Sequence, residues 1–153
     1  MNSSVIKADK LTKRFGDFVA ANELTFEVHA GEIFGFLGAN GAGKTTAMRM
    51  LCGLSVPSSG TASVAGFDVY SQTEDIKKNI GYMSQKFSLY EDLTVMENIR
   101  FYAGIYGLKN DEIKEKSQQL VEQLGLHDSA NKLVRSLPLG WKQKLSFLVA
   151  IIH

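Results

Sequence analysis

Apolar and polar residues alternate along short stretches in the first part of the chain. Residues 24–28 alternate strictly, which is typical of a strand with one buried face. Residues 5–11 have β character and enough apolar positions for an edge strand. Residues 61–64 follow a turn at 57–60 and predict another short strand. The beginning of the chain is therefore expected to be rich in strands.

Two further stretches are apolar almost without interruption. Residues 33–37 and 80–83 are too short for helices, and each predicts a fully buried strand of a parallel sheet. The first of these leads directly into a glycine-rich loop. A buried parallel sheet is therefore expected at the centre of the fold.

Helical patterns mark residues 44–52 and most of the second half of the chain. Thr94 and Glu97 form a capping box, in which a hydroxyl and a carboxylate satisfy free amides at a helix start. This box predicts a helix that ends near Tyr106. The apolar positions of residues 111–124 fall on one face of a second helix. A third helix is expected over residues 141–152.

The chain has 153 residues, which suggests one domain with a core of ordinary size. Strands dominate its first half and helices its second half. We therefore expect an α/β core formed by residues 1–87 and 142–153. A helical subdomain is expected to be inserted into this core over residues 88–141.

The loop after residue 37 matches the phosphate-binding pattern G-x-x-x-x-G-K-[ST]. Glycines let successive N–H groups point inward and form an anion nest, and the helix that follows directs its positive end at the phosphates. The lysine is expected to reach the β- and γ-phosphates of ATP, and the Thr45 hydroxyl is placed to bind Mg²⁺. An accidental glycine-rich turn is the alternative. The candidate ATP-binding residues are Gly38, Asn40, Gly41, Ala42, Gly43, Lys44, Thr45 and Thr46.

Composition narrows the function further. The 17 basic and 16 acidic residues leave a net charge of +1, which gives no global reason to expect nucleic acid or an anionic membrane as partner. Cys52 is the one cysteine, so a disulfide framework within the chain is excluded. The apolar run at residues 147–152 is far shorter than the roughly 20 residues of a membrane-spanning helix. We therefore expect a cytoplasmic protein.

Six blocks of the sequence follow one another along the chain: residues 11–16, 31–46, 51–54, 57–60, 80–85 and 90–98. In this order they resemble the nucleotide-binding domain of ATP-binding cassette (ABC) proteins. The resemblance covers essentially the whole chain. It implies a P-loop core with an antiparallel β subdomain at the N-terminus and an inserted helical subdomain.

The resemblance also implies roles for single residues. Phe15 lies where the family places an aromatic ring that stacks on adenine, and Phe18 is the less favoured candidate. Gln85 lies at the position of a glutamine that approaches Mg²⁺ and the attacking water, and it shares the catalytic role with Lys44. Residues 86–90 resemble the surface on which a membrane subunit docks. Each role has an alternative. Phe15 could be a core or surface residue, and Gln85 could be a solvated loop amide. Residues 86–90 could form local core under the loop.

The segment that resembles the family's Leu-Ser-Gly-Gly-Gln signature departs from it. In the family this segment contacts the γ-phosphate held by a second copy. Proline offers neither a hydroxyl nor an N–H, so contact from this segment is expected to be weaker or to come from Gly140 and the next helix start. The matching residues are Leu137, Pro138, Leu139, Gly140 and Trp141.

The family continues into an acidic strand, a glutamate that acts on water and a switch histidine, which would follow His153. We therefore expect the chain to be a fragment that binds ATP without appreciable turnover; a naturally truncated product is the alternative.

The function that the resemblance implies is that of the ATP-binding subunit of a membrane exporter. Two such subunits would pair head to tail and bind transmembrane permease subunits on the inner face of the membrane. Two alternatives stay open. One is a soluble cassette protein that acts on ribosomes or DNA, and the other is an unrelated P-loop kinase or GTPase.

Overall fold

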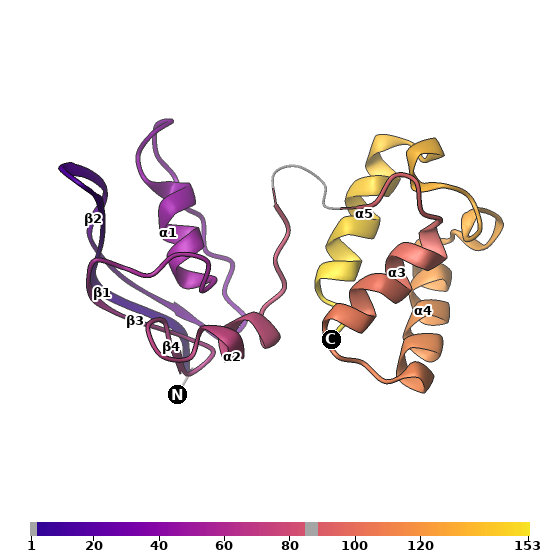
Figure 1. Ribbon diagram of the computed structural model, residues 1–153, viewed down its shortest axis with the longest axis horizontal. Coiled ribbons are helices and arrows are strands. Elements are labelled where there is room, and N and C mark those ends of the chain that lie inside the picture. The colour runs from indigo at the N-terminus through magenta and orange to yellow at the C-terminus, as the bar shows by residue number, and fades with distance from the viewer. Residues whose placement is uncertain (1–2, 85–88) are drawn as a thin grey trace. The chain divides into compact units, whose positions relative to one another are not determined.

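The computed structural model describes residues 3–84 and 89–153. It consists of two compact units, Met1–Ile80 and Gly81–His153, which are described separately below (Figure 1). Within the described ranges, none of the helices has the length and apolar character needed to span a membrane.

The first unit is built on a four-stranded sheet in the order β2-β1-β3-β4. Strand β1 (Ser4–Phe15) forms a long hairpin with β2 (Phe18–His29), and β3 (Ser59–Val64) pairs with β1 and with β4 (Phe67–Asp68). The predicted strands at 24–28 and 61–64 are confirmed. The prediction of an edge strand at 5–11 was wrong, because β1 lies between β2 and β3. Alternation in a sequence shows which face of a strand is buried. It does not show which strands lie beside that strand, because these come from segments far away in the chain.

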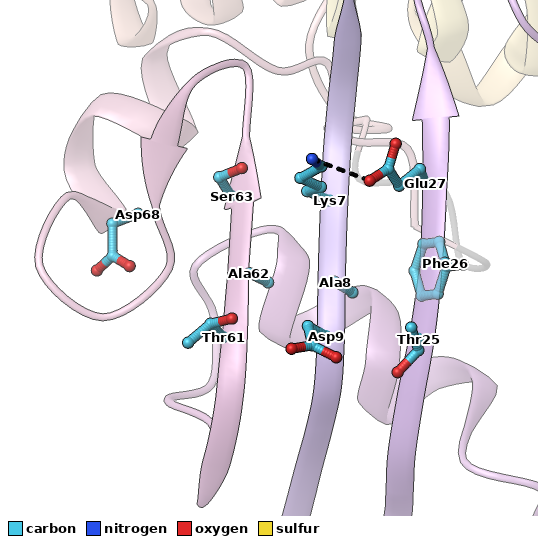
Figure 2. A pocket seen from close by; sticks show the side chains of 10 residues that line it. All are labelled: Lys7, Ala8, Asp9, Thr25, Phe26, Glu27, Thr61, Ala62, Ser63 and Asp68. Atoms are coloured by element: carbon cyan, nitrogen blue, oxygen red, sulfur yellow. Dashed lines mark ion pairs between the residues drawn. The ribbon is translucent and has the colours of Figure 1, made fainter.

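The two faces of this sheet differ in polarity, as the alternation requires. Ala8 and Ala62 are buried and belong to the same core cluster as Met50 of helix α1 (Lys44–Leu51). Figure 2 shows the other face, where an ion pair of 3.0 Å joins Lys7 to Glu27. The polar side chains that line this shallow hollow include Lys7, Asp9, Thr25, Glu27, Thr61 and Ser63.

The structure contradicts the two predicted parallel strands. Residues 33–37 and 80–83 form no strand, and every strand pairing among the described residues is antiparallel. Ile33 and Leu37 are 100% and 95% exposed. The rings of Phe34 and Phe36 pack against Phe26 at centroid distances of 5.2 Å. An apolar run shows a preference for burial, but a strand also needs hydrogen-bonding neighbours, and no described segment pairs with these runs.

The second unit is helical. Its helices are α3 (Val95–Ile105), α4 (Asn110–Leu124) and α5 (Leu139–Ala150), and a short helix α2 (Thr73–Lys78) belongs to the first unit. The predicted helices are confirmed, and Gly125 ends α4 with a positive φ of 64°. Two 3₁₀ turns, His127–Ser129 and Val134–Ser136, join α4 to α5.

Helix α5 differs from its prediction at its start. It begins at Leu139, two residues before the predicted start at Trp141, so the end of the signature-like segment lies in its first turn. Its contacts within this unit are with α3 and α4. The predicted grouping of residues 142–153 with the α/β core stays a prediction.

Candidate functional site

The glycine-rich loop leads into α1, with Gly43 as the residue that precedes the helix. Gly43 has a φ of 79°, and a Cβ atom at this position would overlap the backbone carbonyl oxygen of Ala20 in β2. Any side chain would therefore push the loop away from the sheet. The end of the loop is fixed against β2 because residue 43 is a glycine.

The Lys44 side chain lies inside the curve of this loop. Its ammonium donates hydrogen bonds of 2.6 Å to the carbonyl oxygens of Gly38 and of Ala39. A cation is thus held among loop oxygens next to the start of α1. The first amides of a helix have no partner within the helix, so this place combines a positive charge with free N–H donors.

The remaining phosphate-loop candidates lie around Lys44. Asn40, Gly41 and Ala42 are exposed, and Gly41 has a positive φ of 86° that glycine adopts without strain. Thr45 is exposed in the first turn of α1, whereas Thr46 is half-buried. The structure therefore places the predicted residues along one loop and the first turn of α1, with Asn40, Gly41, Ala42 and Thr45 exposed.

The tip of the β1–β2 hairpin carries two aromatic rings. Phe15 and Phe18 are opposite each other in the hairpin and are 56% and 64% exposed. Phe15 is therefore a surface residue, which excludes the alternative of a core phenylalanine. Because Ala20 follows Phe18 closely in β2 and touches the loop at Gly43, the hairpin tip and the loop belong to the same region of the first unit.

Gln85, the predicted catalytic glutamine, lies outside the described residues, as do residues 86–88 of the predicted docking surface.

The last two residues of the predicted docking surface, Leu89 and Tyr90, differ in burial. Leu89 is buried in the helical core, so the local-core interpretation holds for it, whereas Tyr90 is 48% exposed. The Tyr90 ring contacts that of Phe101 at a centroid distance of 4.8 Å, and Phe101 contacts Tyr102 at 5.5 Å. We call Tyr90, Phe101 and Tyr102 the aromatic cluster.

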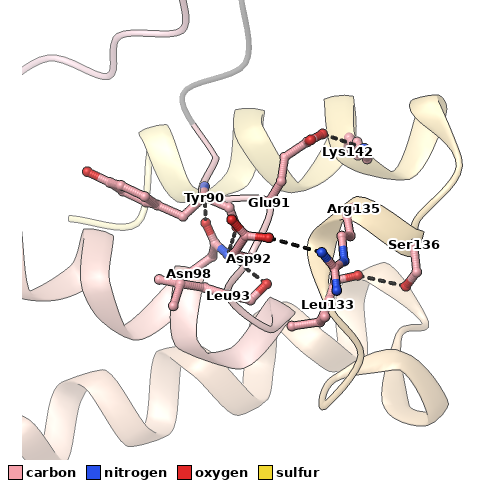
Figure 3. Close-up of polar contacts among 9 residues, drawn as sticks. All are labelled: Tyr90, Glu91, Asp92, Leu93, Asn98, Leu133, Arg135, Ser136 and Lys142. Carbon is pink, nitrogen blue, oxygen red and sulfur yellow. Dashed lines mark hydrogen bonds and ion pairs between the residues drawn. The ribbon is translucent and has the colours of Figure 1, made fainter.

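A buried amide holds the turn that follows Tyr90, and the sequence analysis missed it. Asn98 is fully buried in α3; it accepts a hydrogen bond of 2.8 Å from the Tyr90 amide. It donates to the carbonyl of Tyr90 at 2.9 Å (Figure 3) and to the carbonyl of Thr94 at 3.0 Å. The signal was present, because Asn98 lies three residues after the buried Val95 and thus on the core side of the helix.

Residues on both sides of the signature-like segment are joined to the same turn. The amide of Val134 donates to the carbonyl of Leu93 at 2.9 Å, and that of Arg135 donates to the carbonyl of Glu91 at 3.1 Å. Two ion pairs reinforce this connection (Figure 3): Arg135 to Asp92 at 3.2 Å and Lys142 to Glu91 at 2.7 Å.

Within the segment itself, Leu137 is buried and Leu139 is 63% exposed. Pro138 precedes α5 without a side-chain cap, and its carbonyl accepts hydrogen bonds from the amides of Trp141 and Lys142 at 3.0 and 3.1 Å. Gly140 lies exposed in the first turn. The structure therefore presents a helix start at this segment, without the hydroxyl that the family's serine supplies.

Cys52 and the acidic and histidine side chains are candidate components of a second site in the described part of the chain. Burial raises the pKa of the Cys52 thiol, which disfavours the reactive thiolate. Among residues 3–84 and 89–153, no group of three or more His, Cys, Asp or Glu side chains could hold a metal ion.

Comparison with known sequences gives a consistent result. Residues 21–153 match the family described as ABC transporter. The chain is 47% identical over 150 residues to the probable multidrug ABC transporter ATP-binding protein YbhF of Escherichia coli (strain K12), covering 98% of this chain and 26% of the relative. It is 37% identical over 151 residues to the bacitracin transport ATP-binding protein BcrA of Bacillus licheniformis, covering 99% and 48%. The chain thus spans about a quarter and about half of these relatives.

Solved structures share the fold. An ATP-binding subunit of an ABC transporter superposes with a TM-score of 0.82 at 27% identity, over 97% of this chain and 62% of that one. The fold of cbiO1 from Clostridium perfringens, part of the ABC transporter complex cbiONQ, matches with a TM-score of 0.85 at 22% identity, over 99% and 62%. One chain combines a loop of the phosphate-binding pattern, an antiparallel sheet beside that loop and a helical unit. The chain belongs to the ABC transporter family.

Proposed function

We propose that the chain binds ATP at residues 38–46 and is part of the ATP-binding subunit of an exporter. The observation that carries this proposal is the loop before α1, which holds the Lys44 ammonium in its curve and is fixed to β2 at Gly43. The names of the relatives, which refer to multidrug and bacitracin transport, support the exporter.

Lys44 has a specific role in this proposal. Its ammonium now bonds to two loop carbonyls, and the β- and γ-phosphates of ATP would replace these neutral acceptors with charged ones. The free amides at the start of α1 would bind the same phosphates, since the helix dipole favours negative charge there. The family's chemistry is phosphoryl transfer to water, which relies on positioning and on the neutralisation of charge.

Magnesium fits this donor set. The exposed Thr45 hydroxyl is an oxygen ligand in the first turn of α1, and Mg²⁺ usually takes one or two protein oxygens together with phosphate oxygens and water. When bound, the ion would neutralise phosphate charge. We propose Thr45 as its ligand in this chain, with Gln85 as the second candidate.

The base would lie at the hairpin tip. Phe15 exposes its ring at the end of β1, and a stacked base would bury part of this apolar surface.

We assign partner binding to two surfaces of the helical unit, the start of α5 and the aromatic cluster. A second copy would approach the start of α5 at Leu137–Trp141, and Gly140 and the neighbouring amides would take the place of the missing serine hydroxyl. Tyr90 and Phe101 of the aromatic cluster expose apolar surface on which a permease subunit would dock, on the inner face of the membrane, and the half-buried Tyr102 packs against the helical core.

ATP binding is tested by thermal unfolding of the chain with ATP, with GTP and without nucleotide. At a hundredfold excess over the Kd, ATP should stabilise the chain by about 2.7 kcal/mol. Lys44→Ala should weaken ATP binding by about ten- to a hundredfold, because hydrogen bonds to charged groups contribute about 1.5–3 kcal/mol. Lys78→Ala, which removes an exposed lysine of α2, is the matched control and should bind normally. Equal stabilisation of wild type and Lys44→Ala would contradict the proposed site.

A further inference from the structure

A lysine lies against the exposed ring at the hairpin tip. The Lys13 ammonium is over the Phe15 ring, 5.1 Å from its centroid. The two residues are two positions apart in β1, so their side chains leave the strand on the same side. Lys13 is half-buried, whereas Phe15 is 56% exposed. One face of the ring is therefore in contact with a cation.

The position of this ammonium is fixed from a second direction. Lys13 donates a hydrogen bond of 2.6 Å to the carbonyl oxygen of Val56, in the loop before β3. That loop is itself bonded to β1, since the Ser58 amide donates to the Thr12 carbonyl at 2.8 Å and the Arg14 amide donates to the Ser58 hydroxyl at 2.9 Å. The ammonium is thus held between a backbone-anchored carbonyl and the ring.

This arrangement has two consequences for a molecule that stacks on Phe15. The cation covers one face of the ring, so a planar ligand has the opposite face available. The cation also draws the π electrons of the ring toward itself. A ring polarised in this way is a better stacking partner for an electron-rich purine on its free face.

We propose that Lys13 is a positioning residue for the nucleotide base: it fixes the Phe15 ring and directs the base to the ring face opposite the ammonium. This inference rests on the proposed function, in which Phe15 stacks on the base of ATP. The phosphates are bound elsewhere, at residues 38–46, so the contribution of Lys13 concerns the base alone.

The separation of base from phosphates makes the proposal testable by titration calorimetry of the chain with ATP and with inorganic tripolyphosphate, which has no base. Lys13→Met should weaken ATP binding about two- to fivefold, the range of an exposed cation–π contact, and leave tripolyphosphate binding unchanged. Lys13→Gln, which keeps a donor for the Val56 carbonyl but no charge, should behave in the same way. Lys13→Arg should retain ATP affinity. Lys7→Met removes the same charge from β1 in the 3.0 Å ion pair with Glu27 and should bind both ligands normally.

A double-mutant cycle with Phe15→Leu tests whether Lys13 acts through the ring. In that background Lys13→Met should have no further effect on ATP binding. Equal weakening of ATP and tripolyphosphate would overturn the proposal in favour of general electrostatic attraction. An unchanged ATP affinity in both neutral variants, or a full effect of Lys13→Met without the ring, would also overturn it. Failure of the wild-type chain to bind ATP would instead contradict the proposed function, so the two failures are distinguishable.

Discussion

Gly43 has two constraints at one position. Its φ of 79° is a backbone conformation that side chains disfavour, and the space for a Cβ is occupied by the Ala20 carbonyl. Gly35, a few residues earlier, has neither constraint: its φ is not in the left-handed region, and no neighbouring atom of the described residues lies within 4 Å of its Cβ position. The glycines of this region therefore differ in function although the sequence presents them alike.

Gly43→Ala should destabilise the first unit and abolish most ATP binding. The left-handed conformation alone costs about 1–2 kcal/mol, and the overlap with Ala20 adds to it by displacing the loop. Urea unfolding and ATP calorimetry measure the two effects. Gly35→Ala is the matched control and should keep wild-type stability and affinity. Normal ATP affinity in Gly43→Ala would show that contact with β2 does not position the loop.

At the scale of elements, the start of α3 is held by a capping box. Thr94 accepts a hydrogen bond from the Glu97 amide, and the Glu97 carboxylate accepts hydrogen bonds of 2.8 Å from the Thr94 amide and hydroxyl. These bonds lower the pKa of Glu97 from its ordinary value, with the Thr94 amide as the main cause. Because the folded-state pKa is lowered, the contribution of Glu97 to stability is complete above the ordinary pKa. It is lost as the pH falls through the lowered value.

Thr94→Ala should therefore lower the free energy of unfolding by about 1 kcal/mol at neutral pH, the usual loss for a helix cap. Below about pH 4.3, the ordinary pKa of glutamate, the wild type should lose stability more steeply than Glu97→Gln. Chemical unfolding across pH 3–7 gives, for the wild type and for Glu97→Gln, the slope of the free energy of unfolding against pH. Glu122→Gln, on the exposed surface of α4, is the control and should follow the wild type. Identical slopes for wild type and Glu97→Gln would contradict the capping role.

At the scale of the whole molecule, the chain divides into the units Met1–Ile80 and Gly81–His153. Every proposed contact of the chain with its own ATP, among the described residues, comes from the first unit, at Phe15 and at residues 38–46. The second unit holds the aromatic cluster and the start of α5, which are proposed to meet other chains. Nucleotide binding and partner binding are thus assigned to separate units.

Hydrogen exchange with and without ATP should reflect this division. Amides of α1 and of the β1–β2 hairpin tip should become more protected, because bound ligand suppresses opening of the first unit. Amides of α3, α4 and α5 should change little when the chain is monomeric. Lys44→Ala should remove the difference in the first unit. Protection that rises equally in both units of a monomer would contradict the assignment.

Local signals accounted for the helices and for the phosphate loop. The capping box at Thr94, the glycine at position 125 and the spacing from Gly38 to Thr45 act within a few residues, so the sequence contains all the groups involved. Helical spacing indicates the core-side position of Asn98, but its partners, the carbonyls around Tyr90, lie in a turn whose path no local pattern describes.

The sequence by itself determined the family, the phosphate loop, the helices and the two-faced strands. Only the tertiary structure decided that β1 is internal, that residues 33–37 and 80–83 form no strand, and that Gly43 is fixed by Ala20. The physical reason is the range of the hydrogen bonds. A helix satisfies its backbone groups within one segment, whereas a strand depends on segments far away in the chain, and its pairing cannot be read from its own residues.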